Sequence, residues 1–383
     1  MRFVKEPLDC HGVMTRLTRI SIEGFRSIQS AQVELKPLNI FIGANGAGKS
    51  NLIAFLSLLN YALTRGFQHF VQTRGPASAL LHFGPKATPV MRAAVEFTTA
   101  AGRNEYRCTL THAQGDTLIF AHEEAEFQAQ GNPTPKVVPL GSGGHRESGL
   151  SEPWAENDST ARVMKFLLGQ CRVYQFHDTS LESHLRSNPP ADDNGYLRAN
   201  GGNLAAFLFR LQHELPDEFR RIENSLNTVL PWFKDFALEP QGQPPKETIP
   251  LRWRTPDKPD YEFSAGQLSD GSLRIMCLIT LLLQPERLRP KLIVLDEPEL
   301  GLHPAAESLV AGLIKAASAS SQILVSTQSA TFLDHFCADD VIVAENEQGR
   351  STFTRQSSEA LKGWLDRYSL GQVWQKDVIG GRP

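Results

Sequence analysis

Hydrophobic and polar residues alternate from Leu17 up to the glycine-rich segment that follows Ile42. This two-residue period, the abundance of Ile and Val, and turn residues at Gly24 and Pro37 predict short antiparallel strands followed by a buried strand over 38–42. The next apolar segment, NLIAFLSLLNYAL, has the 3.6-residue period of a helix. The glycine-rich segment is therefore predicted to lie between a strand and a helix.

The middle of the chain changes pattern three times. Alternation returns between 66 and 127 and predicts a further β-rich layer. The next thirty or so residues are rich in Gly, Pro, Ser, Asn and charge without an apolar period, which predicts a mobile loop. The segment GGNLAAFLFRLQHELPDEFRRIENSLNTVL predicts two amphipathic helices, the first started by Asn203 and separated from the second by Pro216. These two helices make up a predicted helical lobe.

The last third of the chain, after a Pro-rich connection, alternates helices with buried strands, which predicts a largely parallel sheet. The expected fold is α/β, with an antiparallel β layer, a mostly parallel core sheet flanked by helices, and an inserted helical lobe. We expect five parts along the chain: a disordered or wrongly assigned N-terminal tail over 1–15, the N-terminal half of a head over 16–127, the mobile loop over 128–160, a region containing the helical lobe over 161–262, and the C-terminal half of the head over 263–383.

Composition narrows the class of protein. A chain of 383 residues with 41% hydrophobic and 21% charged residues can bury a full core. Its 39 basic and 42 acidic residues give a net charge of -3, so any binding to nucleic acid would need a local basic patch. The 5 cysteines form no CxxC pair, which favours reduced thiols in the cytoplasm over zinc or redox sites. The longest apolar run, MCLITLLL, is far shorter than the roughly 20 residues that cross a membrane, and the first residues lack the apolar stretch of a signal peptide.

Residues 43–50 read GANGAGKS and match the phosphate-binding pattern G-x-x-x-x-G-K-[ST], the Walker A motif or P-loop, at the strand-to-helix junction that it requires. Glycines let backbone amides turn toward phosphates without Cβ clashes, and the helix adds the positive end of its dipole. Lys49 is expected to reach the β- and γ-phosphates of ATP, Ser50 to offer its hydroxyl to Mg²⁺, and Asn45 to contact the γ-phosphate. The predicted nucleotide-binding residues of this region are Gly43, Ala44, Asn45, Gly46, Ala47, Gly48, Lys49, Ser50 and Asn51.

The run KLIVLDE at 291–297 places four apolar residues, which suit a strand buried on both faces, before two carboxylates. Because side chains alternate along a strand, Asp296 and Glu297 have different tasks: Asp296 can hold the shell of Mg²⁺, and Glu297 can polarise a water aimed at the γ-phosphate. A strand ending in Asp-Glu is, alone, more often a surface feature. Together with the P-loop upstream it predicts a Walker B motif.

Between these motifs lies LSDGSLR, at 268–274, followed by the apolar helix RIMCLITLLL. The segment resembles the signature motif of ABC-type ATPases, usually LSGGQ, whose serine and helix N-terminus bind the γ-phosphate held by the opposite subunit. The resemblance implies this trans role for Leu268, Ser269, Asp270 and Gly271, although Asp270 replaces a glycine of the motif. The alternative is a simple helix cap, since Ser-Asp is good capping chemistry.

Two further positions are assigned by the same resemblance. The segment PELGLHP after Glu297 is similar to the dimer-contacting loop of the superfamily. The strand QILVSTQS then ends at Gln328, where ABC proteins commonly place a switch histidine. Glutamine cannot carry the charge of histidine, but it can donate a hydrogen bond to phosphate or orient water. Gln328 therefore joins Lys49 and Glu297 as the expected catalytic residues.

The remaining candidates lie earlier in the chain. In VYQFHDTS, at 173–180, Gln175 resembles the Q-loop glutamine and is favoured over His177 and Asp178 as the residue that senses Mg²⁺; a plain turn is the alternative. The expected metal-binding residues are thus Ser50, Asp296 and Gln175. The segment GFRSI resembles the N-terminal signature of SMC and RecF heads, where the arginine approaches nucleotide, so Arg26 is a nucleotide-binding candidate against the alternative of an exposed turn arginine.

The motif order resembles an SMC/RecF/OLD-like, ABC-type P-loop ATPase of the AAA family from Leu17 onward, and the ending YSLGQVWQKDVIGGRP resembles stand-alone bacterial members without a nuclease domain. The resemblance implies a cytoplasmic ATPase that forms a homodimer or higher oligomer around ATP and Mg²⁺, acts in DNA repair or anti-phage defence, and works with a separately encoded effector such as a nuclease, with DNA as a further candidate partner and no membrane. One alternative is a non-catalytic nucleotide-sensing scaffold, which Gln328 keeps open. Another is a transporter subunit, which the long separation of Ser50 from Gln175 disfavours.

Overall fold

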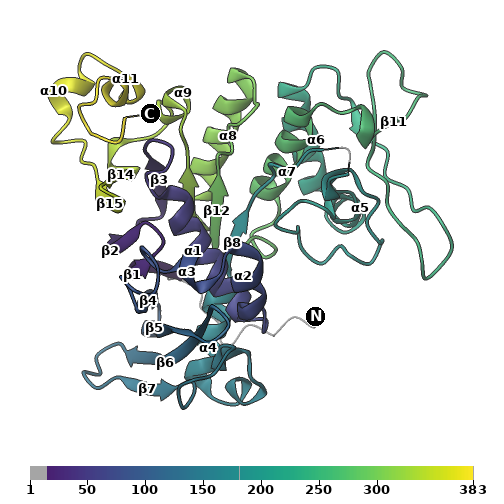
Figure 1. Cartoon of the computed structure of the whole chain (residues 1–383). Coiled ribbons are helices and arrows are strands. Elements are labelled where there is room, and N and C mark those ends of the chain that lie inside the picture. The colour runs from purple at the N-terminus through teal and green to yellow at the C-terminus, as the bar shows by residue number, and fades with distance from the viewer. Residues whose placement is uncertain (1–14, 181, 383) are drawn as a thin grey trace.

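A computed structural model describes residues 15–180 and 182–382 of the chain, and Figure 1 shows its arrangement. The expected N-terminal tail lies, apart from Thr15, outside the described residues. One antiparallel sheet has the order β2-β1-β4-β5-β6-β7. Its strands are β1 (Arg16–Phe25), β2 (Ile28–Glu34), β4 (Val90–Thr99), β5 (Gly102–Ala113), β6 (Thr117–Ala129) and β7 (Lys136–Pro139). This sheet is the antiparallel layer that the alternating pattern predicts.

The core sheet has the order β15-β14-β3-β13-β12-β8. Its strands are β3 (Leu38–Ile42), β8 (Cys171–Tyr174), β12 (Leu292–Asp296), β13 (Gln322–Ser326), β14 (Val341–Glu347) and β15 (Arg350–Arg355). All neighbours pair in parallel except the edge strand β15, which pairs with β14 in the antiparallel sense. Parallel strands place their carboxyl ends at one edge, so the segments that follow β3, β12 and β13 meet there.

The core sheet is buried on both faces, and successive residues of its strands alternate between two hydrophobic clusters. In β3, for example, Ile40 belongs to one cluster and Phe41 to the other, as the two-residue period of a strand requires. The antiparallel layer and four helices cover the Phe41 face: α1 (Lys49–Ala62), α2 (Phe67–Arg74), α3 (Ala77–Leu80) and α4 (Ser159–Gly169). The helices on the Ile40 side include α7 (Asp270–Leu283), α8 (Pro304–Ala317), α9 (Ala330–Leu333), α10 (Lys362–Leu365) and α11 (Leu370–Gln375).

The predicted helical lobe is present between β8 and α7, at the right of Figure 1. It contains α5 (Leu204–Glu214), α6 (Pro216–Val229) and a small sheet of β9 (Asp235–Phe236), β10 (Arg252–Arg254) and β11 (Phe263–Ser264). Asn203 precedes α5, but its side chain binds the backbone of residues 193–198 instead of capping the helix. Over the described parts of the chain, no helix combines the length and apolar character that a membrane crossing needs.

The segment 128–160 differs from the mobile loop that its composition predicts. It contains the end of β6, all of β7, two short 3-10 helices and the start of α4. The physical reason is Glu123 of β6, whose carboxylate is fully buried. It accepts hydrogen bonds from Ser148 Oγ, from the Gly149 backbone N–H at 2.8 Å and from His145 Nε2 at 2.8 Å. The polar residues that suggested a loop therefore satisfy a buried charge. Leu140, Leu150 and Ala155 of the same segment lie in the core.

Candidate nucleotide-binding site

The P-loop connects β3 to α1 at the carboxyl edge of the core sheet, as predicted. Three of its glycines have backbone conformations that L side chains rarely adopt: Gly43 has φ 147°, Gly46 φ 81° and Gly48 φ 113°. A Cβ atom at Gly43 would lie 2.2 Å from the carbonyl oxygen of Ala344, whereas one at Gly46 would meet no heavy atom within 4 Å. The loop is thus held tightly at its base and is open at its tip, which is the shape that a phosphate cradle needs.

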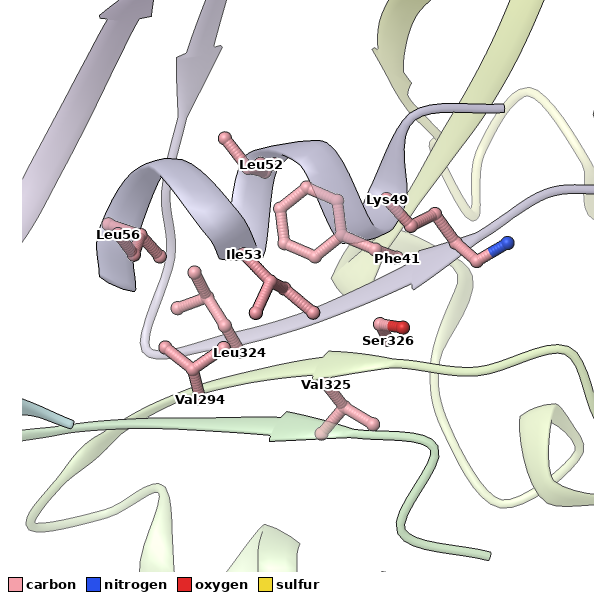
Figure 2. A pocket seen from close by; sticks show the side chains of 9 residues that line it. All are labelled: Phe41, Lys49, Leu52, Ile53, Leu56, Val294, Leu324, Val325 and Ser326. Atoms are coloured by element: carbon pink, nitrogen blue, oxygen red, sulfur yellow. The ribbon is translucent and has the colours of Figure 1, made fainter. Parts of the chain in front are cut away.

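Lys49 begins α1 and is only 5% exposed. Its Nζ donates hydrogen bonds to the carbonyl oxygens of Gly43 and, at 3.1 Å, of Ala44 in its own loop. Burial lowers the pKa of Lys49, and the nearby carboxylates of Glu297, Asp296 and Glu299 partly offset that effect. Figure 2 shows an apolar recess between α1 and the core sheet, with the Lys49 amino group and the Ser326 hydroxyl at its polar end. The lysine therefore brings a buried positive charge to the cradle.

Asp296 lies at the carboxyl end of β12 and pairs in register with Ser326 of β13, the strand that separates β12 from β3. Ser326 Oγ donates to Asp296 Oδ1 at 2.7 Å, and Gln175 Nε2 donates to Asp296 Oδ2 at 3.3 Å. His177 Nε2 also bonds the Asp296 carbonyl oxygen at 2.8 Å, whereas Asp178 accepts from Ser180. Of the three Q-loop alternatives, Gln175 is thus the one whose side chain contacts the Asp296 carboxylate. Its role toward Mg²⁺ stays a prediction.

Glu297 and Gln328 lie in direct contact. Gln328 Nε2 donates to Glu297 Oε1, and the Glu297 backbone N–H donates to the Ser326 carbonyl oxygen at 2.8 Å. Glu297 has φ 44°, a left-handed conformation that costs a non-glycine residue roughly 1–2 kcal/mol. Such strain is often found where a side chain must be held for function. The fold therefore brings the expected catalytic glutamate and the switch glutamine together, although the sequence separates them by 31 residues.

Glu299 is a third carboxylate in this region, and it is only 8% exposed. Its Oε1 accepts from Thr327 Oγ1 and, at 3.4 Å, from the Gln328 backbone N–H, while its Oε2 is buried and has no partner among the described residues. Burial, with a smaller contribution from the neighbouring Glu297 carboxylate and against the effect of these hydrogen bonds, raises the pKa of Glu299 to about 7. Glu299 therefore joins the Walker B loop to the end of β13 and changes charge near neutral pH.

This raised pKa predicts a pH-dependent effect of Glu299→Gln on nucleotide-free, magnesium-free protein. Between the ordinary pKa of 4.5 and about 7, folded wild type binds a proton that the unfolded chain has lost, so its stability falls as pH rises through that window. Glutamine does not titrate, so the stability of the Glu299→Gln variant does not fall in this window. Its free energy of unfolding should match wild type near pH 4, below the unfolded pKa, and exceed it by about 3 kcal/mol near pH 8.

Chemical denaturation across this pH range measures the difference. The control is Glu286→Gln, because the side chain of Glu286 is 72% exposed. A difference between Glu299→Gln and wild type that is the same at both ends of the range contradicts the shift.

Arg26 lies in the turn between β1 and β2, beside the P-loop helix. Its guanidinium donates to Asn51 Oδ1 at 3.4 Å and to the Arg74 carbonyl oxygen at 2.9 Å. Asn51 in turn donates to Ser27 Oγ at 2.6 Å, which fixes the turn to the start of α1. Burial, together with the positive charge of Arg74, lowers the pKa of Arg26. A half-buried cation in this environment favours an anionic ligand; the nucleotide contact of Arg26 stays a prediction.

The signature segment forms the start of α7, which packs on the opposite face of the core sheet from α1. Ser269 is exposed and accepts a hydrogen bond from the Ser272 backbone N–H at 3.2 Å, so it is the N-cap that the alternative interpretation predicts. Asp270, the departure from the usual motif, forms an ion pair at 3.1 Å with Arg186. Arg186 also donates to the carbonyl oxygens of Ala265 and Leu268, at 2.5 and 3.1 Å. The acidic substitution is therefore matched by a cation.

Two arginines that sequence reasoning missed hold the signature segment in place. Arg186 joins it to the stretch after the Q-loop through the Thr179 carbonyl oxygen at 2.9 Å. Arg274 donates to carbonyl oxygens on both neighbouring loops, at 3.1 Å to Phe176, at 3.0 Å to His177 and at 3.0 Å to Leu300. Arg274 lies in the LSDGSLR segment, so the sequence gave a signal for its place near the site. Arg186 gave none, because its partners in the signature segment are 79 to 84 residues away.

These residues fit a magnesium nucleotide. The loop offers backbone N–H groups at an open tip, Lys49 and Arg26 supply positive charge, and Ser50 is exposed. The Asp296 carboxylate and the Gln175 amide supply the oxygen ligands that Mg²⁺ prefers. A P-loop, a strand-end Asp-Glu pair and a serine-led helix on one parallel sheet define an ABC-type P-loop nucleotide-binding head.

Comparison with known proteins agrees. Residues 16–79 match the family model "AAA ATPase domain", and residues 168–334 match "AAA domain, putative AbiEii toxin, Type IV TA system". The chain is 24% identical to the Old nuclease of Escherichia phage P2, over 91% of this chain but 63% of that protein. It is also 24% identical to the DNA replication and repair protein RecF of Actinobacillus pleuropneumoniae, over 81% of this chain and 91% of that protein.

Solved structures share the fold. An SMC head bound to the C-terminal winged-helix domain of ScpA superposes with a TM-score of 0.60 at 16% identity, covering 90% of this chain and 99% of that one. The SMC head with an extended coiled coil, bound to the C-terminal domain of ScpA from Pyrococcus furiosus, gives 0.56 at 13% identity, covering 92% and 99%. The chain thus matches AAA-type ATPase family models in two segments, is similar in sequence to Old nuclease and RecF, and shares the fold of SMC heads.

Proposed function

We propose that this chain binds and hydrolyses ATP with Mg²⁺, and that ATP joins two copies of the chain into a dimer. The observation that carries the proposal is the meeting of Lys49, Asp296 and the Glu297–Gln328 pair at the open edge of one parallel sheet. Each of these side chains is the type that phosphoryl transfer needs at that place: a cation for the phosphates, a carboxylate for the metal and a second carboxylate for water.

In the proposed mechanism, Mg²⁺ neutralises phosphate charge when bound, and the protein supplies position and electrostatics. Lys49 moves from the carbonyl oxygens of its own loop to the phosphates. Asp296, held by Ser326 and Gln175, would hold the metal shell. Glu297 accepts the hydrogen bond of a water and orients it, while Gln328 fixes the Glu297 carboxylate and is positioned to donate to the γ-phosphate. A glutamine that already contacts the glutamate can therefore replace the usual switch histidine.

The trans part of the proposal rests on the position of Ser269. Its hydroxyl and the N-terminus of α7 are exposed, and α7 packs on the face of the core sheet opposite to α1. A site that needs both the P-loop and this helix end would be completed by a second copy, in the isologous way of two-fold dimers. Release of phosphate would then open the dimer.

Ser269→Arg tests this arrangement. The variant should bind Mg·ATP as wild type does, because its P-loop is intact. It should stay monomeric, because the large, positively charged arginine side chain blocks the dimer contact. It should therefore release phosphate at least about 100-fold more slowly. Isothermal titration, light scattering with ATP and a phosphate-release assay give the three readouts, with Asn224→Arg on the exposed side of α6 as control. Wild-type turnover by a monomeric Ser269→Arg protein rejects the trans site. A wild type that binds ATP, dimerises and never releases phosphate instead supports a nucleotide-sensing scaffold.

We further propose a role in DNA repair or anti-phage defence, in the cytoplasm, with a separately encoded effector such as a nuclease. The relatives support this role by what they are, a phage nuclease and a DNA replication and repair protein, together with the family model for a putative toxin. Affinity capture with the product of the adjacent gene, followed by DNA cleavage with and without ATP, tests it. The expected result is an ATP-dependent change in DNA cleavage. Failure to capture a partner, together with no effect on DNA, contradicts the proposal.

A further inference from the structure

A short loop beside the P-loop carries the most exposed of the large hydrophobic side chains that the structure describes. Residues 81–84 follow α3, and Phe83 is 67% exposed. The loop is fixed to the β1–β2 turn: Leu81 forms an isolated bridge with Phe25, the His82 N–H donates to the Gly24 carbonyl oxygen at 3.1 Å, and His82 Nδ1 bonds the Arg26 carbonyl oxygen at 2.6 Å. The exposed ring therefore stands on a rigid support next to the predicted nucleotide contact.

The backbone of Phe83 is held in a left-handed conformation, with φ 56°. Phenylalanine rarely adopts it, and a bulky residue there is a real outlier. Packing does not account for the cost, because two thirds of the side chain is in contact with solvent. The part that is covered packs against the buried ring of His82, at 4.2 Å between ring centroids and with the ring planes tilted by 49°. Strain of this kind, at an exposed side chain, is a reason to look for a ligand.

The ring of Phe83 and the tip of the P-loop share one support, the turn of the β14–β15 hairpin. A Cβ atom at Gly349 in this turn would lie 2.6 Å from Phe83 Cζ, so the ring rests on the glycine backbone. In the same turn, Asn346 Nδ2 donates to the Gly46 carbonyl oxygen at 3.0 Å. Phe83 and Gly46 therefore contact residues only three positions apart, and the aromatic ring lies on the rim of the phosphate cradle.

We propose that Phe83 is the stacking platform for the purine base of the nucleotide whose phosphates the P-loop holds. The inference deepens the proposed function and rests on it. The P-loop binds phosphates through backbone amides and a lysine, which do not sense the base, so the affinity for the nucleoside must come from the rim. An exposed aromatic ring stacks on a base through the π-face that every base presents. The glycine at 349 leaves room for the end of the ring beside the turn, while most of Phe83 stays exposed to solvent.

The test compares ligands with and without a base. Mg·ATP and Mg·tripolyphosphate are titrated into wild type, Phe83→Ala and Phe83→Gly by isothermal titration. Both variants should lose about 5- to 150-fold in affinity for ATP and keep their affinity for tripolyphosphate. Phe83→Gly accommodates the positive φ, so it separates loss of the ring from backbone strain. Phe83→Tyr should bind ATP as wild type does, as should Trp364→Ala, which removes an aromatic residue that is 43% exposed and lies outside the site.

Three results overturn parts of this scheme, and they can be distinguished. Unchanged ATP affinity in Phe83→Gly removes the stacking role and leaves the proposed function intact. Equal losses for ATP and tripolyphosphate show that Phe83 supports the shape of the P-loop instead of binding the base. A wild type that binds neither ligand overturns the nucleotide-binding function itself, and the inference falls with it.

Discussion

Lys49→Ala should greatly weaken ATP binding and, with it, ATP-dependent dimerisation. Lys49 is buried among carboxylates and P-loop carbonyl oxygens, so its amino group is poised to pair with phosphate in a poorly solvated place. Truncating one member of such a charge pair costs about 2–5 kcal/mol, which is roughly a 30- to 4000-fold loss of affinity. Isothermal titration with Mg·ATP measures the loss, and light scattering measures the dimer.

The fold should survive this change. The Lys49 hydrogen bonds go only to its own loop, and the apolar residues that line the recess beneath α1 remain in place. Lys362→Ala, at an exposed lysine of α10, is the matched control and should bind ATP as wild type does. If Lys49→Ala binds ATP with wild-type affinity while keeping the wild-type melting temperature, the GANGAGKS segment is not the phosphate cradle.

The parts of the site that the sequence predicts well have local requirements. The P-loop needs glycines at left-handed positions between a strand and a helix, and both flanking elements are visible in the period of the apolar residues. The Asp-Glu pair needs only a short apolar strand before it. For the same reason the α/β class, the antiparallel layer and the two lobe helices could be predicted, and the structure confirms them.

The rest depends on contacts between residues far apart in the chain, which no local pattern records. Strand order is one case: β14 follows β13 in sequence, but β3 lies between them in the sheet. The segment 128–160 is another, because its order depends on the buried carboxylate of Glu123, 25 residues before Ser148. Phe83 is a third case. Its exposure and positive φ are tertiary properties, and the sequence shows only a phenylalanine before a glycine.

Contacts across the chain also link the three motifs of the site into one mechanical unit. Gln175 contacts the Walker B aspartate, and Arg274 joins the Q-loop and the loop after Glu297 to the signature helix. If one motif moves on ATP binding, these direct hydrogen bonds would therefore transmit the movement to the others. This arrangement supports the proposed coupling between ATP binding and the dimer contact.

Glu297→Gln should separate ATP binding from hydrolysis and trap the ATP-bound dimer. The glutamine keeps the size of the side chain and can still bond Gln328, but it cannot act as a base toward water. Loss of a positioned general base lowers the rate by about 10²- to 10⁴-fold. Phosphate release should fall by that factor, affinity for Mg·ATP should stay within about threefold of wild type, and light scattering should show a dimer that persists after free ATP is removed.

The comparison with Glu299→Gln makes the result specific. Glu299 lies two residues further along and contacts Thr327 and the Gln328 backbone, but it has no hydrogen bond to the Gln328 side chain. Its substitution should change the pH dependence of stability without trapping a dimer, because the Glu297 carboxylate is still there to orient water. A Glu297→Gln protein that stays monomeric with ATP contradicts the trapped dimer, and one that turns over at the wild-type rate assigns the base to another residue. In the latter case Glu299 is the next carboxylate to test, since its buried Oε2 atom has no partner among the described residues.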